Sequence, residues 1–416
     1  MSLEIDKVIG QITRMAEDIR SGETGWLERQ ESALQLVEQP GMEPASIRDR
    51  IGRAKVTWLV SEPLEALSAT HPAPALPEDY GVASVDGSSI DPDRHGPARC
   101  YLINIGIAAL RYGSRPGAEL RSEPRLYARE EDLVLRDPDS AAEQLMNPSL
   151  VGIKRMVEET RRLLKEMEKE PPRVPTVCLL DGTLVPIGLI GGGAPDFVRR
   201  RFLDEGLLEV LDGFRELSEE APVALASYIS YPGSAEVVNS LRVLLCPHSP
   251  FPDCDRHCSK DRGENAGCGA CVAAPEGTRE CDTVSMIRDR DVFGKLLAVG
   301  ERSGLFASRS SIVRDSYREH HVQFFYVNVG EEIGRVEMPR WVSRREEMVD
   351  LVHSVALEQC RLGQGYPLAL AEAHEQAVVS GADREEFWRM VDIEMGGSGV
   401  SAVRSAKAGS KQTRWV

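Results

Sequence analysis

The chain has 416 residues, of which 42% are hydrophobic and 28% charged, and its formal net charge is −16. This composition predicts two or three globular domains and argues against a basic surface that coats nucleic acid. An enzyme that acts on nucleic acid is not excluded, because metal ions can cancel carboxylate charge and local arginines can hold phosphates. No run of about 18 apolar residues occurs, and the first residues are acidic where a signal peptide would be basic. We therefore expect a soluble, cytoplasmic protein.

The first 78 residues predict a helical region that ends in a proline-rich linker. Six apolar residues recur at spacings of three and four, namely Ile5, Val8, Ile9, Ile12, Met15 and Ile19. This spacing is typical of an amphipathic helix, whose apolar face packs either on the core or on another subunit. Apolar positions from Leu34 to Val60 indicate more helix, and Pro72, Pro74 and Pro77 then indicate a stiff, extended linker.

Two short apolar runs each end in an Asp-Gly pair. Residues 82–85 precede Asp86, and residues 177–180 precede Asp181. Both runs read as buried strands, and open α/β sheets build their sites at the carboxyl ends of such strands. We expect Asp86 and Asp181 to lie together there and to bind a hard divalent cation such as Mg²⁺ or Mn²⁺. The alternative is that each Asp-Gly pair only turns the chain.

A β-rich stretch, residues 101–110, predicts a strand that pairs with the first one. The segment after it carries arginines among tyrosines, including Arg111, Arg121 and Arg125. Arginines with aromatic residues often hold single-stranded nucleic acid through phosphate pairing and base stacking. The alternative is a solvated hairpin in which nearby glutamates neutralise these arginines.

Residues 150–169 have the apolar periodicity of a helix that is interrupted by Glu158 and Glu159. At 100° per residue, Glu159 lies at the flank of the apolar stripe and Glu158 points away from it, so Glu159 is better placed to reach the sheet. A further amphipathic helix, residues 202–214, and a strand, residues 222–230, follow. The resulting order of elements is that of a ribonuclease H-like α/β fold, with a mixed sheet flanked by helices.

The VDGSS strand, the glutamate in a long helix, the LLDGT strand and the late segment Tyr366-Pro-Leu-Ala-Leu-Ala-Glu-Ala-His374 resemble the NurA family of DNA-end-processing nucleases. The resemblance runs from about Tyr80 to Phe387. It implies a ribonuclease H-like fold, 5′–3′ exonuclease and single-strand endonuclease activity with manganese, and a homodimer. It also implies a role in DNA end resection and repair with the hexameric translocase HerA, and no membrane association.

The resemblance implies that Asp86, Glu159 or its neighbour Glu158, Asp181 and His374 form the active site. Two cations bridged by Asp86 would activate a water for attack on a phosphodiester. His374 would bind a metal or protonate the departing 3′-oxygen, although a lone helical histidine is often structural. Tyr228 is a further candidate for DNA binding, although many relatives carry a lysine near this position and its absence here leaves the role at a DNA phosphate open.

Six of the nine cysteines lie within residues 246–281, in a segment that is poor in apolar residues: Cys246, Cys254, Cys258, Cys268, Cys271 and Cys281. Disulfides are disfavoured in a cytoplasm, and Cys268 and Cys271 have the spacing of a metal knuckle. We expect structural zinc, with an iron–sulfur cluster as the alternative. The favoured ligands are Cys254, Cys258, Cys268 and Cys271, with Cys246, Cys281, His248 and His257 as substitutes. Unliganded or disulfide-linked cysteines are the remaining possibility.

The rest of the chain predicts strands at residues 322–329 and 334–342 and several helices that close a nuclease domain of residues 79–395. The last residues, 396–416, read as a flexible basic tail. A rival enzyme class is an actin-like or sugar-kinase-like ATPase, because Gly191-Gly192-Gly193 follows Asp181 and such glycine-rich turns can hold nucleotide phosphates. A third hypothesis is a non-enzymatic adaptor that uses the cysteine insert and the terminal helix.

Overall fold

A computed structural model describes residues 4–93, 98–190, 194–248, 250–258 and 279–398. The chain folds into two compact units. The first comprises residues up to Pro72 together with Ser230–Ser310 and Gln323–Arg335. The second comprises Ala73–Ile229, Ser311–Val322 and the residues from Val336 onward. The chain thus enters the second unit three times, and each unit is described separately below.

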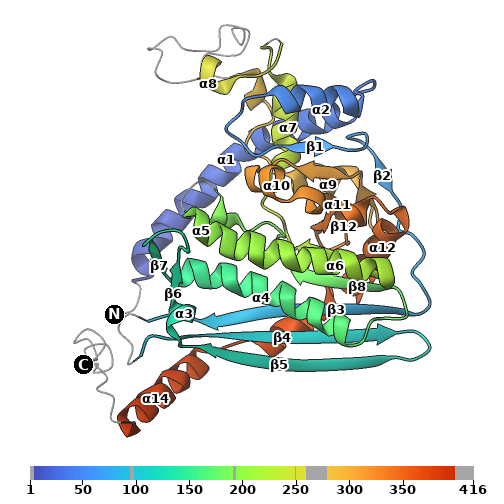
Figure 1. Cartoon of the computed structure of the whole chain (residues 1–416). Coiled ribbons are helices and arrows are strands. Elements are labelled where there is room, and N and C mark those ends of the chain that lie inside the picture. Colours follow the sequence, from blue (N-terminus) through green and yellow to red (C-terminus); the bar gives the residue numbers. More distant parts are fainter. Residues whose placement is uncertain (1–3, 94–97, 191–193, 249, 259–278, 399–416) are drawn as a thin grey trace. The chain divides into compact units, whose positions relative to one another are not determined.

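The second unit contains five consecutive strands of a mixed sheet, in the order β5-β4-β3-β8-β9 (Figure 1). Strands β3, β4 and β5 are antiparallel neighbours, whereas β8 pairs in parallel with both β3 and β9. This order and direction are those of the ribonuclease H-like fold, which the sequence predicted. The strands are β3 (Tyr80–Ile90), β4 (Tyr101–Tyr112), β5 (Gly117–Tyr127), β8 (Thr176–Asp181) and β9 (Val223–Ile229), with a separate pair β6 (Val134–Arg136) and β7 (Glu143–Leu145).

The helical segments of the second unit are α3 (Glu130–Leu133), α4 (Pro148–Lys169), η1 (Ile187–Leu189), α5 (Asp196–Arg199), η2 (Arg200–Leu208), α6 (Glu209–Glu220), α10 (Ser311–Ser316), η4 (Arg318–His320), α11 (Arg340–Ser343), α12 (Glu346–Leu362), α13 (Leu368–Ala377) and α14 (Gly381–Gly397). The helix predicted at residues 150–169 is α4, and Asn147 caps its first turn by accepting a hydrogen bond from the Leu150 amide (3.1 Å). The segment η2 is a stretch of π-helix that continues into α6.

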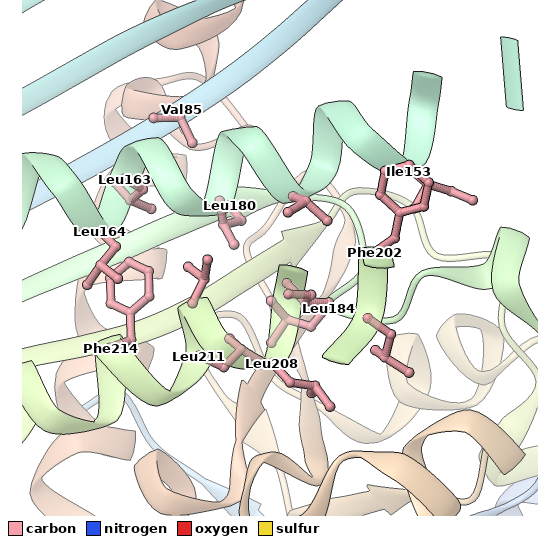
Figure 2. Close-up of a cluster of buried hydrophobic side chains, with 14 of the residues drawn as sticks. Val85, Ile153, Leu163, Leu164, Leu180, Leu184, Phe202, Leu208, Leu211 and Phe214 are labelled. Atoms are coloured by element: carbon pink, nitrogen blue, oxygen red, sulfur yellow. The ribbon is translucent and has the colours of Figure 1, made fainter. Parts of the chain in front are cut away.

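One face of the sheet is covered by α4, which also packs against α6 and η2. Their apolar side chains form one buried cluster with the strands. In Figure 2, Leu163 and Leu164 of α4 and Leu211 and Phe214 of α6 lie around Leu180 of β8. Burying such side chains stabilises the fold by about 1.5–3 kcal/mol each. This cluster holds α4 against the sheet, where it contacts β3.

The helix α13 packs directly on β3 and β4. This close approach depends on Gly106 of β4, because a Cβ there would overlap the carbonyl oxygen of Ala373 and lie 2.5 Å from the Ala377 nitrogen. Ala369, Ala373 and Ala377 are fully buried at the contact. The small residues of the late alanine-rich segment therefore let a helix backbone lie against the sheet.

The first unit contains α1 (Asp6–Val37), α2 (Pro44–Arg53), β1 (Ser61–Pro63), β2 (Thr70–His71), α7 (Glu236–Leu245), α8 (Cys254–His257), η3 (Glu280–Asp282), α9 (Asp289–Leu296), β10 (Arg302–Ser303), β11 (Phe306–Ser308) and most of β12 (Val322–Asn328); β13 (Ile333–Pro339) runs from this unit into the second. Its core joins Val37 of α1 and Ile51 of α2 with Val237 of α7 and Phe324 of β12. Residues 230–310 thus cluster in space with the N-terminal helices.

The apolar stripe of the N-terminal helix was expected to pack either on the core or on another subunit, and it does not pack on the core. Ile5, Ile9, Ile12, Met15 and Ile19 are each more than half exposed, and the buried residues of α1 begin at Gln30. The apolar stripe therefore does not pack on the core, and contact with another subunit stays a prediction. Among the described residues, no helix is long and apolar enough to cross a membrane. The tail from residue 399 onward and Gly191–Gly193 lie outside the described residues.

Candidate active site

The two predicted aspartates lie at equivalent positions of neighbouring parallel strands. Val85 of β3 is paired with Leu180 of β8, and Asp86 and Asp181 are the next residue of each strand. The side chain of Asp86 is 18% exposed. The strands therefore bring both carboxylates to one edge of the sheet, as the repeated sequence pattern predicted.

The glycines that follow the two aspartates have different structural roles. Gly182 has a φ of +79°, which favours glycine, and its amide donates to the Tyr228 carbonyl (2.9 Å), so it turns the chain. Gly87 continues strand β3. A Cβ on Gly87 would overlap Glu159 Oε1 and lie 2.9 Å from Arg155 Cγ. Gly87 thus leaves the space through which Glu159 approaches the strand end.

Glu159, and not Glu158, reaches the two aspartates from α4. Glu158 forms an ion pair with Arg161 (2.9 Å) on the same helix. Glu159 lies beside Arg155, with 3.1 Å between Glu159 Oε1 and Arg155 Nε, and its side chain is 14% exposed. Glu159 Oε1 is nevertheless buried without a hydrogen-bond partner. A buried carboxylate oxygen of this kind is suited to accept a cation.

The three acids influence one another electrostatically. Burial raises the pKa of Glu159 to about 7 against the lowering effect of Arg155, and the charges of Asp86 and Asp181 add to the rise. Burial also raises the pKa of Asp181, while the hydrogen bond from Tyr366 lowers it and the charge of Asp86 raises it. A bound cation would lower the electrostatic repulsion among carboxylates that are held together away from solvent.

His374 lies on α13 and contacts Asp86, with 2.7 Å between His374 Nδ1 and Asp86 Oδ2. The end of α13 is held by strand residues, because Asn104 donates to the Ala377 carbonyl (2.9 Å) and Ser88 donates to the same oxygen. Gly106, the cross-strand partner of Asp86, allows the helix to approach. These strand residues therefore fix where the imidazole lies. The His374 side chain is 62% exposed, so a substrate can reach it.

Tyr366 and Glu337 complete the surroundings of Asp181. The Tyr366 hydroxyl donates to Asp181 Oδ1 (2.9 Å), and its ring makes an edge contact with Tyr228, at 6.0 Å between centroids. The buried Glu337 accepts hydrogen bonds from Thr183 Oγ1 (2.8 Å) and from the Leu184 amide (2.9 Å). These contacts orient Asp181 and hold the turn that follows it. Tyr228 itself is fully buried and has no surface to offer to DNA, in contrast to the role predicted for it.

The predicted DNA-binding arginines fall into different surroundings. Arg121 is engaged by Glu119, Glu123 and Glu166, as the hairpin alternative expected. Arg125 lies 5.0 Å over the Tyr127 ring and lines a cavity of about 310 Å³. That cavity also contains Glu123, Glu158, Arg161, Arg162 and Lys165. Arg111 lines a second cavity, of about 1000 Å³, at the other end of the hairpin.

The three candidate acids do not form a closed metal site among the described residues. In the part of the chain that the structure describes, no three His, Cys, Asp or Glu side chains surround a single ion position. Each active-site acid instead has a protein neighbour: His374 at Asp86, Tyr366 at Asp181 and Arg155 at Glu159. Of the predicted thiolate ligands, Cys254 and Cys258 are described, whereas Cys268 and Cys271 lie outside the described residues.

Sequence reasoning missed four residues that shape this site. Tyr366 begins the late segment that ends in His374, so its position was visible although its role was not. Arg155 lies one helical turn before Glu159, a spacing that permits an ion pair. Gly106 and Glu337 act through contacts between distant parts of the chain, and nothing in their local sequence signals either contact.

Similarity to known proteins places the chain in a family. No curated protein matches the chain significantly. LC9-RNase H1, described as a type 1 RNase H with the type 2 active-site motif, is a similar solved structure at 10% identity and a TM-score of 0.21, covering 40% of this chain and 71% of that chain. The NurA domain matches residues 80–379, which include Asp86, Glu159, Asp181 and His374. Because this match covers well over half of the chain, the protein belongs to the NurA family.

Proposed function

We propose that the protein is a metal-dependent deoxyribonuclease that hydrolyses phosphodiester bonds by a two-metal mechanism. The observation that carries this proposal is the convergence of Asp86, Asp181 and Glu159 from two parallel strands and the helix that covers them. Membership of the NurA family supports the same class of reaction. Acids gathered at a sheet edge, where burial raises the pKa of Glu159 and of Asp181, are typical of a functional site.

The donor set fits Mn²⁺ or Mg²⁺. All three candidate ligands are carboxylates, which these hard cations prefer, and Glu159 Oε1 lacks a hydrogen-bond partner. Asp86, Glu159 and Asp181 would hold the cations, which supply an activated water and stabilise the leaving oxygen. Cations would bind through carboxylate oxygens beside the present contacts, such as Asp181 Oδ2 next to the Oδ1 that accepts the hydrogen bond from Tyr366.

The remaining side chains would position substrate and protons. His374 is held at Asp86 by α13, is exposed, and can donate a proton to the departing 3′-oxygen or bind a cation. Tyr366 fixes the orientation of Asp181, and Arg155 keeps Glu159 near the strand end. Arg125 and the basic side chains that share its 310 Å³ cavity, Arg161, Arg162 and Lys165, are candidates to hold DNA phosphates. Arg111 is a second candidate at the other cavity.

The family supports the biological setting. We propose a 5′–3′ exonuclease and single-strand endonuclease that takes part in DNA end resection and repair in the cytoplasm, as a homodimer with a HerA-type hexameric translocase. The exposed apolar stripe of α1 is one surface available for a protein contact. The chain's acidic charge favours binding through a few local arginines over a broad basic face.

The direct test uses the purified full chain and DNA labelled at either end. We expect nucleotide release with Mn²⁺ and loss of cleavage in EDTA, with the order of products giving the polarity. The matched variant Asp181→Asn should show no release above background and normal circular dichroism. Cleavage by Asp181→Asn at the wild-type rate would contradict the proposal. ATP hydrolysis without DNA cleavage would support the ATPase alternative, and neither activity would support the adaptor.

A further inference from the structure

Four cysteines of the first unit come together from separate stretches of the chain. Cys246 follows α7, Cys254 begins α8, Cys258 follows α8, and Cys281 lies in η3. Cys281 is buried and the other three are partly buried. In the part of the chain that the structure describes, no disulfide joins them. Their common location calls for an explanation that does not involve the carboxylate site.

The four thiols share one local environment. The Cys254 thiol is hydrogen bonded to that of Cys258, and burial together with the charges of Cys258, Cys246 and Cys281 raises the pKa of Cys254 to about 12. The charge of Cys246 likewise contributes to raising the pKa of Cys281. The Cys254 thiol is thus within electrostatic reach of the other three thiols, which come from three segments of the chain. Thiolates are the preferred ligands of zinc and of iron–sulfur clusters.

Backbone contacts hold the segments that carry these cysteines. The Cys254 amide donates to the Lys55 carbonyl (2.8 Å), and the Lys55 amide donates to the Pro252 carbonyl (2.9 Å). Arg50 of α2 donates to the carbonyls of Val243 and Cys246. Arg242 of α7 donates to the Cys281 carbonyl (3.0 Å). The cysteines are thus presented by a framework of α2 and α7 and not by one continuous loop.

The surroundings also suit a negatively charged centre. Arg279 donates to the Cys258 sulfur, and Cys281 is acted on by the charge of Asp282 and by those of Arg242 and Arg279, which both pair with Asp282 and leave a net positive charge. A four-thiolate metal centre carries net negative charge, which these guanidinium groups offset. In contrast, the helix α8 buries no side chain, so apolar packing cannot be what orders it. A metal cross-link would supply that order.

We propose that Cys246, Cys254, Cys258 and Cys281 are the four ligands of a thiophilic metal centre, either a zinc ion or an iron–sulfur cluster. This set differs from the expectation that included Cys268 and Cys271. Within the described residues, no group of side chains is arranged to bind a single ion. Binding of one zinc ion would therefore require the cysteine side chains to change rotamer, whereas an iron–sulfur cluster is larger and would need less movement. The centre ties α8 and η3 to α7.

The experiment uses full-length protein purified without oxygen and without added metal. Zinc, iron and acid-labile sulfide are measured for the wild type, for single serine variants of Cys246 and Cys281, and for the double variant Cys268→Ser/Cys271→Ser. We expect about one zinc ion, or an iron and sulfide complement with visible absorption, per chain. Cys246→Ser and Cys281→Ser should each lose at least about 90% of the metal, and the double variant should keep it. Sulfide and iron identify the cluster, and their absence with zinc present identifies the single ion.

A wild-type measurement covers the case in which the variants do not fold. X-ray absorption at the bound metal should show four sulfur neighbours, at about 2.3 Å for zinc, and no oxygen or nitrogen ligand. The proposal is overturned by wild-type protein with no tightly bound metal and all thiols titratable, or by disulfides among the four. It is equally overturned if the double variant loses the metal while Cys246→Ser and Cys281→Ser retain it.

Discussion

The carboxylate site and the cysteine cluster are two groups of side chains of the types that bind metals, and they are built in opposite ways. Asp86 and Asp181 are adjacent because parallel β-strands place equivalent positions side by side. Cys246, Cys254, Cys258 and Cys281 are adjacent because loops and short helices are tied to α2 and α7 by hydrogen bonds. The first site is a consequence of the fold, whereas the second would help to make its local fold. Substitution of the acids should therefore leave the structure of the sheet intact, whereas substitution of the cysteines should loosen α8 and η3.

The largest effect should come from Glu159 compared with its neighbour. Glu159→Gln removes a ligand that Asp86 and Asp181 face, so we expect the rate of Mn²⁺-dependent cleavage to fall by at least about 1,000-fold. Glu158→Gln removes an acid whose partner is Arg161, and its rate should stay within about threefold of the wild type. Steady-state cleavage assays measure both. Equal losses in the two variants would mean that α4 does not select one acid for the site.

A second prediction tests the helix that covers Asp86. Gly106→Ala forces α13 away from β4, so His374 leaves Asp86; we expect cleavage to fall by about 10- to 100-fold and stability by about 1–3 kcal/mol. Denaturant unfolding and cleavage assays measure the two effects. The control is Gly152→Ala on α4, where nothing lies within 4 Å of the added Cβ. That variant should cleave normally and gain up to about 1 kcal/mol. Normal cleavage by Gly106→Ala would refute the role given to α13.

A smaller effect is expected at Tyr366. Tyr366→Phe keeps the ring that contacts Tyr228 but removes the hydroxyl that donates to Asp181. We expect cleavage to fall by about tenfold, with a weaker apparent affinity for Mn²⁺, because Asp181 is no longer oriented. Rates measured across a range of Mn²⁺ concentrations separate the two changes. An unchanged rate at every concentration would show that the hydrogen bond has no part in the site.

The last prediction concerns the free energy of unfolding and its dependence on pH without divalent cations, and no effect on cleavage enters it. Burial raises the pKa of Glu159 from 4.5 to about 7, so its contribution to stability is full below pH 4.5 and is lost as the pH rises through 7. Glu159→Gln resembles the protonated form and should therefore become more stable than the wild type with rising pH, by up to about 3 kcal/mol at pH 8. Unfolding curves at several pH values measure the difference. A constant difference from pH 4.5 to pH 8 would contradict the buried state of Glu159.

The sequence predicted much of the carboxylate site because its signals are local. Each aspartate ends an apolar strand, and the helical phase of α4 distinguishes Glu159 from Glu158. One reading of the Asp-Gly pairs was incomplete, since Gly182 turns the chain while Gly87 makes room for Glu159. Gly106 and Glu337 could not be assigned, because their effects depend on α13 and on the turn after Asp181. The spacing of the cysteines in the sequence favours Cys254, Cys258, Cys268 and Cys271. It does not indicate that η3, which carries Cys281, packs against α7.

Binding of Mn²⁺ to protein prepared without Mn²⁺ or Mg²⁺ tests the central claim most directly. Calorimetric titration of the full chain at pH 7.5 should show two Mn²⁺ ions bound with release of protons, because Glu159 is partly protonated before binding. Asp86→Asn should bind neither ion tightly, and it should keep the metal held by the cysteines. Tight binding of Mn²⁺ by Asp86→Asn as in the wild type, or no binding by the wild type, would contradict the account of a carboxylate metal site.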